Sequence, residues 1–559
     1  MKSTKRIISS FGAVAIIFSN FMFNIFILTS TGTMVYGVSG EAIIGEVNEI
    51  STMVVQGSSG LKSPTDGQVI TISNNMPIEL IHGASPVVPY VDRKPKISKK
   101  IKEQMLTEKF WLNKLGGSAN KVLMTLDQIK EINKNILELP ESETKCVDLD
   151  KFSKILTRDE LLNKLQQVGQ NRIVDLDENS DNLTDKEIYG EERYLISDQI
   201  GSDYCKDLLK NLNRSAVKDI NDVKYGFVAK TTVMRTMPTM DKLYDCPNDL
   251  YIDQNSETGL KVWERVLILH ESLDSKFYLV QAYNYQGWVK KEDIAVATTK
   301  QWEEYKDPIK FIMITGSEVR LEINPIDNRK SSLKFVMGTK LPRPISKIPE
   351  TIDGVKVQDK TYVVELPLVD KQGKLEVGLG QIPLYNIDYI SKDYLPYTQE
   401  NVLKLAFKML GKVYGWSNSL DSIDCSSLTQ NIYQTFGFKL PRNQTKQSLT
   451  PGLKRVDFRE TPMNEREKKE LIMSSPVGTL LYSPLHVALY IGNYEGEPYI
   501  IHSLFGHSSK DGQDFESVAS VVVTDLNFPI KKPDPQDPDK KIMTKFWDGI
   551  IILNNYSGK

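Results

Sequence analysis

The stretch that decides the fold runs from Tyr414 to Gln447 and reads YGWSNSLDSIDCSSLTQNIYQTFGFKLPRNQTKQ. A turn-rich segment of Gly, Ser, Asn and Asp leads to the cysteine at its centre, Cys425. Beyond the cysteine, apolar residues recur at a spacing of four, at Leu428, Ile432 and Phe436. This spacing is typical of an amphipathic helix, and Gly437 marks its end. We therefore expect a helix whose first turn contains Cys425.

The position of Cys425 favours a chemical role. Asp424 is suited to be the N-cap of the helix. A helix N-terminus favours negative charge, so it lowers the pKa of a thiol and promotes the thiolate that acts as a nucleophile. The alternative is a buried, inert cysteine, which is the commoner situation for a cysteine near a helix start.

The histidines that could serve such a cysteine lie further along the chain. Residues 484–492 and 498–502 read as two strands of a hairpin around a Gly-Asn-Tyr-Glu-Gly turn. Folding this hairpin about Tyr494 places His486 directly opposite His502. One imidazole can then take the thiol proton while the other orients it. The alternatives are a surface pair or two metal ligands, and a metal is disfavoured because no carboxylate or cysteine lies beside them at short ligand spacing.

Three motifs together resemble a known family. They are Asp-Cys-Ser-Ser-Leu at 424–428, Leu-Pro-Arg at 440–442 with a Gln five residues after the Arg, and His-Val-Ala-Leu-Tyr-Ile-Gly at 486–492. The set is similar to that of the NlpC/P60 family, papain-like cysteine peptidases that cut bacterial cell-wall peptides. The resemblance covers roughly residues 396–559. It implies a papain-like α+β catalytic domain that needs no metal or other cofactor.

The resemblance also assigns roles to residues of this chain. It implies that Cys425 is the nucleophile, His486 the base and His502 the third polar residue. Tyr414 matches a tyrosine that lines the oxyanion site. Three further residues match or adjoin the substrate side of the cleft: Trp416, Asp424 and Ser426.

Length and composition limit the number of domains, the kinds of partner and the state of the cysteines. A chain of 559 residues is too long for a single core, so we expect several domains. The net charge of −2 gives no electrostatic reason to expect a nucleic-acid partner. The four cysteines are scattered without a Cys-x-x-Cys pair, so we expect free thiols, with a single Cys146–Cys205 bridge as the alternative.

The N-terminal 40 residues read as an export signal. Lys2, Lys5 and Arg6 precede an apolar run from Ile7 to Leu28, the pattern of a basic region followed by a hydrophobic one. We therefore expect a signal peptide at 1–40, with an uncleaved membrane anchor as the alternative. The Gly-, Ser- and Pro-rich residues that follow, 41–95, read as a linker.

The remaining chain reads as four parts, which makes the fold class multidomain α+β. Helical periodicity predicts a helical N-terminal domain, and short strands separated by turns predict two β-barrels in tandem. The Arg-Thr-Met-Pro-Thr opening at 235–239 and the Gly-Trp-Val ending at 287–289 resemble a bacterial SH3-like domain. The expected parts are a helical domain at 96–224, SH3-like domains at 225–297 and 298–393, and the papain-like domain at 394–559.

We interpret the whole as an exported cysteine endopeptidase that acts on peptidoglycan peptides as a monomer in the cell envelope or outside the cell. The resemblance implies cleavage of the γ-D-glutamyl–diamino acid bond. It also implies that the first SH3-like domain, through Glu264 and Tyr285, closes the cleft so that stem peptides with a free N-terminal L-Ala are preferred. The Asp424 carboxylate, on the substrate side, is the expected partner of the L-Ala ammonium. The alternatives are a non-catalytic wall-binding protein, and an amidase or acyltransferase that uses the same Cys-His-His site.

Overall fold

The computed structural model divides the chain into two units, Met1–Asp92 and Arg93–Lys559. In the first unit it describes only three antiparallel strand pairs: β1 (Ile16–Ser19) with β2 (Asn24–Ile27), β3 (Thr33–Val38) with β4 (Glu41–Glu46), and β5 (Thr52–Val54) with β6 (Val69–Thr71). In the second unit it describes residues 101–556 except 145, 169–171, 175, 177–182, 248–251, 360, 417–420, 462, 484–485, 509–514, 527–529, 535–536 and 545–548.

The predicted signal or anchor segment at 1–40 and the predicted linker at 41–95 fall largely outside the described residues. Within the part of the chain that the structure does describe, no helix has the length and apolar character needed to cross a membrane.

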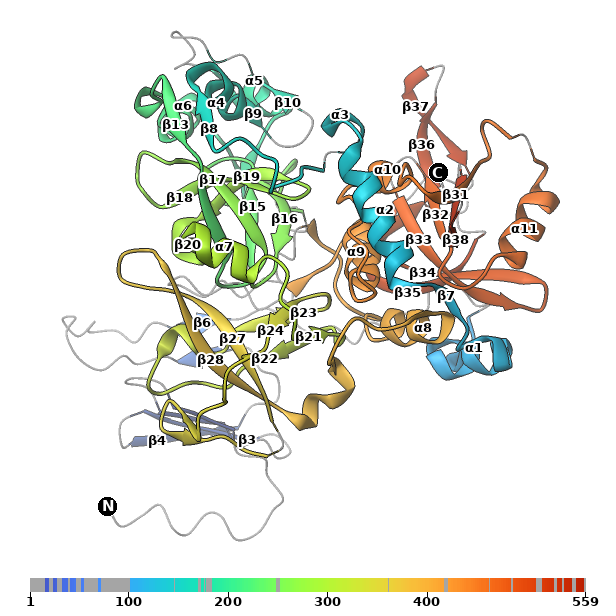
Figure 1. The fold of residues 1–559 in the computed structure, drawn as a ribbon, viewed down its shortest axis with the longest axis horizontal. Helices are drawn as coiled ribbons and strands as arrows, with labels where there is room; N and C mark the ends of the chain where they lie inside the picture. The colour runs from blue at the N-terminus through green and yellow to red at the C-terminus, as the bar shows by residue number, and fades with distance from the viewer. Residues whose placement is uncertain are drawn as a thin grey trace. The chain divides into compact units, whose positions relative to one another are not determined.

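A six-stranded antiparallel sheet forms the framework of the C-terminal domain (Figure 1). Its strand order is β31 (Leu453–Asp457), β38 (Gly549–Tyr556), β32 (Leu480–Ser483), β33 (His486–Tyr494), β34 (Glu497–Ser508) and β35 (Phe515–Asp525). Apolar side chains that alternate along β33 join two different buried clusters, so both faces of the sheet are covered. The hairpin β33–β34 is the one predicted around Tyr494.

Helices cover this sheet and carry the first site residue. They are α8 (Gln399–Phe407), α9 (Cys425–Gln434), α10 (Gln444–Gln447) and α11 (Glu465–Ser474). The predicted stripe of α9 is buried, with Leu428, Ile432 and Phe436 each no more than 1% exposed. Gly437 has a φ of 97°, a left-handed conformation that suits glycine after a helix, as expected from the sequence.

The predicted helical domain at 96–224 is divided between two hydrophobic cores. Its first part contains α1 (Glu108–Leu115), β7 (Val122–Met124), α2 (Leu126–Glu138) and α3 (Glu141–Thr144). The buried isoleucines of α2 pack with the C-terminal domain, and β7 pairs with β30 (Tyr397–Thr398) of that domain. A helical pattern identifies the buried face of a helix but not the element that it packs against, which is why the sequence missed this division.

The second part of that region packs against the first β-domain. It contains α4 (Arg158–Leu165), α5 (Asp185–Tyr189) and α6 (Ser202–Asn211). It also has three short strand pairs: β8 (Ile155–Thr157) with β13 (Ile220–Asp222), β9 (Gln167–Val168) with β10 (Arg172–Ile173), and β11 (Tyr194–Leu195) with β12 (Asp198–Gln199).

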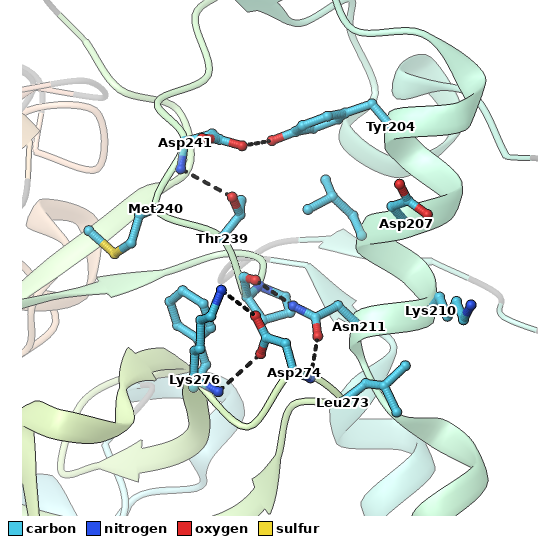
Figure 2. Close-up of a pocket in the computed structure, with 13 residues that line it drawn as sticks. Tyr204, Asp207, Lys210, Asn211, Thr239, Met240, Asp241, Leu273, Asp274 and Lys276 are labelled. Carbon is cyan, nitrogen blue, oxygen red and sulfur yellow. Dashed lines mark hydrogen bonds and ion pairs between the residues drawn. The ribbon is translucent and has the colours of Figure 1, made fainter. Parts of the chain in front are cut away.

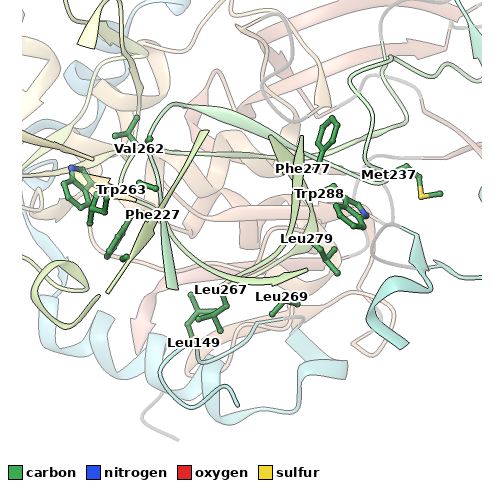
Figure 3. Close-up of a cluster of buried hydrophobic side chains, with 14 of the residues drawn as sticks. Leu149, Phe227, Met237, Val262, Trp263, Leu267, Leu269, Phe277, Leu279 and Trp288 are labelled. Carbon is green, nitrogen blue, oxygen red and sulfur yellow. The ribbon is translucent and has the colours of Figure 1, made fainter. Parts of the chain in front are cut away.

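The first β-domain is a seven-stranded antiparallel sheet. Its order is β16 (Ser256–Leu260), β15 (Thr232–Arg235), β19 (Gln286–Lys290), β18 (Phe277–Ala282), β17 (Arg265–Glu271), β14 (Lys224–Val228) and β20 (Ile294–Ala297). Phe227, Leu267, Leu279 and Trp288 lie in its buried cluster (Figure 3). The bulge between Ile268 and His270 bends the sheet, as small barrels require.

The next region, 298–393, is a set of small antiparallel sheets that follows α7 (Thr299–Tyr305). One sheet has the order β24 (Lys340–Pro342), β21 (Phe311–Ile314) and β29 (Ile390–Ser391). The others are β22 (Glu318–Arg320) with β23 (Lys334–Val336), β25 (Thr351–Ile352) with β26 (Val355–Lys356), and the long hairpin β27 (Thr361–Val369) with β28 (Leu375–Pro383). That this region is a second SH3-like barrel stays a prediction.

Candidate active site

Cys425 is the first residue of α9, as predicted. Asp424 is its N-cap, and a carboxylate oxygen accepts a hydrogen bond from the backbone N–H of Ser427 at 2.8 Å. Gln447, from the motif that follows the helix, donates from Nε2 to the Ser426 carbonyl oxygen at 3.1 Å. The first turn of α9 is therefore fixed from both sides, and only 7% of the Cys425 surface is exposed.

The predicted lowering of the Cys425 pKa is wrong for this resting structure. Burial raises the pKa of the thiol to about 12, and the negative charge of Asp424 raises it further. The backbone N–H groups of Val487 and Ser426 and the charge of Arg442 act in the opposite direction but do not outweigh burial. The helix position was predicted correctly, but the sequence gave no measure of how completely the thiol is removed from water.

His486 and His502 are in contact. His486 Nε2 lies 2.8 Å from His502 Nδ1, and the two rings meet edge to face with their centroids 5.1 Å apart. The register differs from the predicted one, because Leu489 pairs with Ile501 and a bulge lies between Tyr490 and Gly492. The histidines are therefore diagonal neighbours on one face, and the expected direct pairing is corrected.

The histidine pair is shut off from solvent, with His486 9% and His502 0% exposed. Burial lowers the pKa of His486 to about 3 and holds the pKa of His502 well below its usual range. The other ring nitrogen of His502, Nε2, lies 3.0 Å from the hydroxyl of Thr524 on β35. At neutral pH Cys425 is therefore a thiol and His486 a neutral imidazole, the form that accepts a proton.

Tyr414 lies beside the nucleophile. Burial is the largest cause that raises the pKa of its hydroxyl, and the charges of Cys425 and Asp424 add to it. The Trp416 side chain makes a hydrogen bond with this hydroxyl and is itself 36% exposed. The structure thus brings Tyr414 and Trp416 together near Cys425 and fixes the phenol as a neutral hydrogen-bond donor.

A buried ion pair stands on the other side of the nucleophile. Arg442 donates from Nη1 to Asp424 Oδ1 at 3.1 Å and from Nη2 to Oδ2, and both residues are no more than 7% exposed. Arg442 Nη1 also donates to Ser426 Oγ at 2.8 Å, and Nε donates to Thr258 Oγ1 of β16 at 2.9 Å. Arg442 therefore joins the nucleophile loop to the first β-domain, a role that the sequence motif did not reveal.

The first β-domain brings to this edge a carboxyl group that the sequence analysis did not name. Glu257, next to Thr258, accepts from Thr236 Oγ1 at 3.0 Å and makes a hydrogen bond with Tyr285, and the charge of Arg442 acts on it. Burial raises the pKa of Glu257. Tyr285 is thus placed at the edge as predicted, since the charge of Asp424 reaches its hydroxyl.

Glu264 binds within its own domain, where its carboxylate accepts from the backbone N–H of Lys261 at 2.9 Å. The alternation of β16 could have pointed to Glu257, but no sequence signal distinguishes it from other strand carboxylates.

A separate pocket of about 530 Å³ lies away from these residues, between α6 and two loops of the first β-domain (Figure 2). Tyr204 donates to Asp241 Oδ2 at 2.8 Å at one end, and Asn211 Nδ2, also in the lining, donates to the Pro238 carbonyl oxygen at 2.8 Å. None of the predicted site residues lines it. Among the described residues, no group of three or more His, Cys, Asp or Glu could hold a metal ion, and all four cysteines are free.

Two regions of the chain match known family models. Residues 411–516 match the family model of the NlpC/P60 family. The C-terminal domain is an NlpC/P60 domain. This family consists of cysteine peptidases, so the enzyme class predicted from the sequence is confirmed. Residues 243–290 match the SH3 domain of the SH3b1 type, which identifies the first β-domain as SH3-like.

A solved structure shares the fold of this chain. An NlpC/P60 endopeptidase from Photobacterium damselae subsp. piscicida is 17% identical, with a TM-score of 0.57 over 79% of this chain and 96% of that one. An NlpC/P60 family protein from Bacillus cereus is 17% identical, with a TM-score of 0.35 over 58% of this chain and 99% of that one. None of the curated proteins compared matches the chain in sequence.

Proposed function

We propose that this protein is an exported cysteine endopeptidase that hydrolyses the γ-D-glutamyl–diamino acid bond of peptidoglycan stem peptides. The observation that carries the proposal is the hydrogen-bonded pair of His486 and His502 within an NlpC/P60 domain, where the backbone N–H of Val487, next to His486, bonds to Cys425 at the N-terminus of α9. The SH3-like domain supports a wall-derived substrate.

The proposed reaction is acyl transfer to the cysteine. The Cys425 proton passes to His486, and the thiolate attacks the γ-carbonyl carbon to form a C–S bond. Collapse of the tetrahedral intermediate breaks the C–N bond, and His486 gives the proton to the leaving amine. His486 then deprotonates a water molecule that hydrolyses the thioester and restores the thiol.

The surroundings of Cys425 suit the charged groups that form during this reaction. Burial disfavours a thiolate alone and an imidazolium alone, so each is best formed with the other as its partner. The oxyanion would be held by the backbone N–H of Cys425 and the hydroxyl of Tyr414, which is neutral because its pKa is raised.

We further propose that the cleft selects peptides with a free N-terminal L-Ala. Asp424 was the expected partner of the substrate ammonium, but both of its oxygens accept hydrogen bonds from Arg442. Glu257 is the better partner, because its bonds to Thr236 and Tyr285 come from neutral hydroxyls. A carboxylate so placed gains a charge-assisted bond when an ammonium arrives.

Product analysis on a defined peptide tests the proposal. L-Ala-γ-D-Glu-diamino acid peptides should give L-Ala-D-Glu as the only N-terminal product by mass spectrometry. Cys425→Ala should abolish this product, and Cys246→Ala, which removes an exposed thiol elsewhere, should leave the rate unchanged. Cleavage at another bond would refute the assigned bond. Binding without turnover would support a wall-binding protein, and transfer to an added amine would support an acyltransferase.

A further inference from the structure

The histidine pair continues into a third buried residue on the neighbouring strand. His502 pairs directly with Val522 of β35, and Ile500 pairs with Thr524, so Thr524 is a diagonal neighbour of His502 on the same face. Its hydroxyl lies 3.0 Å from His502 Nε2, and only 1% of the Thr524 surface is exposed. The contacts thus run in one line from His486 through His502 to Thr524.

Two arrangements of the protons satisfy the hydrogen bonds from His486 through His502 to Thr524, and only one of them lets His486 act as a base. In the first, His502 carries its proton on Nε2 and donates it to the Thr524 hydroxyl. His502 Nδ1 then accepts from the Nε2–H of His486, which leaves His486 Nδ1 unprotonated. In the second, His502 donates from Nδ1 to His486 Nε2, so the neutral His486 carries its proton on Nδ1. That nitrogen can then take no proton from a thiol.

We propose that Thr524 is a positioning residue that supports the first arrangement by accepting a hydrogen bond from His502 Nε2–H. This inference rests on the proposed roles of Cys425 and His486. In the first arrangement the buried His502 Nε2–H needs an acceptor, and the Thr524 hydroxyl, 3.0 Å away, supplies it. In the second arrangement the same hydroxyl would donate to the bare Nε2, so Thr524 supports the tautomer that catalysis needs and does not impose it alone. The proton that passes from Cys425 through His486 to the leaving amine never reaches Thr524, which acts only through the tautomer of the two rings.

Several ionisable groups lie near this line and must remain unchanged in the test. Asp424 acts on His486, and His507 acts on His502. Arg442 acts on Cys425, and the charge of Cys425 acts on Tyr414 and Tyr482. A substitution at Thr524 leaves all of these charges in place, so a change in kcat can be assigned to the imidazole tautomers.

The test compares Thr524→Val, which keeps the shape but removes the hydroxyl, with Thr524→Ser, which keeps the hydroxyl. Wrong-tautomer substitutions next to a catalytic histidine cost about 10⁴-fold in kcat in Ser-His-Asp enzymes. Thr524 lies one residue further away, so we expect a loss of about 10- to 100-fold in kcat with KM unchanged, and recovery of most of the rate in Thr524→Ser.

A matched control is Thr435→Val, because Thr435 is also buried and its hydroxyl binds the Ile432 carbonyl oxygen of its own helix at 2.7 Å. This variant should keep the native kcat. An unchanged kcat in Thr524→Val, or a loss that serine does not restore, would overturn the inference. If Cys425→Ala remained active, the proposed function itself would fail instead.

A second measurement needs no variant at Thr524. With ¹⁵N-labelled histidine in the full chain, which has five histidines, long-range ¹H–¹⁵N correlation reports the tautomer of each ring. We expect both His486 and His502 to carry their proton on Nε2. A proton on Nδ1 of neutral His486 would overturn the inference, and Thr524→Val should shift the pair towards that state.

Discussion

The negative charge of Asp424 opposes ionisation of the adjacent thiol, and the substitution Asp424→Asn tests this. Asn caps helices about as well as Asp, so the backbone N–H of Ser427, now 2.8 Å from the carboxylate, keeps an acceptor. The substitution removes a charge that raises the pKa of Cys425, while the charge of Arg442, which lowers it, remains. The thiol of the variant should therefore be more acidic than the native one.

The magnitude follows from the charges. Two unit charges roughly 6 Å apart interact by about 3 kcal/mol at an effective dielectric constant of about 20, which changes the thiolate fraction by about a hundredfold. The same substitution leaves the buried Arg442 without its ion-pair partner, which costs about 3–5 kcal/mol of folding stability. The variant should thus melt at a lower temperature and still have the more reactive thiol.

The assay is the rate of Cys425 alkylation by iodoacetamide at pH 8, well below the melting temperature, followed by peptide mass spectrometry. Cys246→Ser serves as the background, because Cys246 is exposed and would compete for the reagent. The matched control is Asp457→Asn, which breaks another buried carboxylate's bonds to Arg455 and Arg459 in the same domain. It should lower stability without accelerating alkylation. An unchanged or slower rate in Asp424→Asn would refute the reasoning.

Three further predictions concern the same site. His486→Ala should lower kcat nearly as much as loss of Cys425, because the two act as a unit, whereas His502→Gln should keep measurable turnover. A lower kcat in His502→Gln than in His486→Ala in steady-state assays would mean that His502 is the base and His486 the orienter. The native enzyme should prefer free over N-acetylated L-Ala peptides by about 2–5 kcal/mol in kcat/KM, and Glu257→Gln should reduce this preference. Equal rates for both peptides with the native enzyme would contradict an ammonium site. Burial lowers the folded-state pKa of His486 from 6.5 to about 3, so between these pH values the unfolded chain binds more protons than the folded one. The free energy of unfolding should therefore fall as pH drops through that window, by up to about 1.4 kcal/mol per pH unit. Tm measured from pH 7.5 to 4.5 should decrease, less steeply in His486→Gln, and a flat native profile would contradict a buried neutral ring.

The sequence by itself determined the local structure of the site. The spacing of Leu428, Ile432 and Phe436 predicted helix α9 with Cys425 in its first turn, and the hairpin pattern predicted that His486 and His502 would meet. These features depend on residues close together in the chain, where periodicity and turn chemistry act directly. Three motifs of this kind also sufficed to indicate the family that the family model confirms.

Tertiary structure decided the properties that depend on residues far apart in the chain. The bond from Arg442 to Thr258 spans two domains, and the packing of α2 into the C-terminal core divides a region that reads as one helical domain. The raised pKa of Cys425 arises because packing removes the thiol from water, and burial on this scale outweighs the favourable field of a helix terminus. Local pattern fixes which groups stand at the site, whereas the charge they carry is set by the desolvation that only the assembled fold imposes.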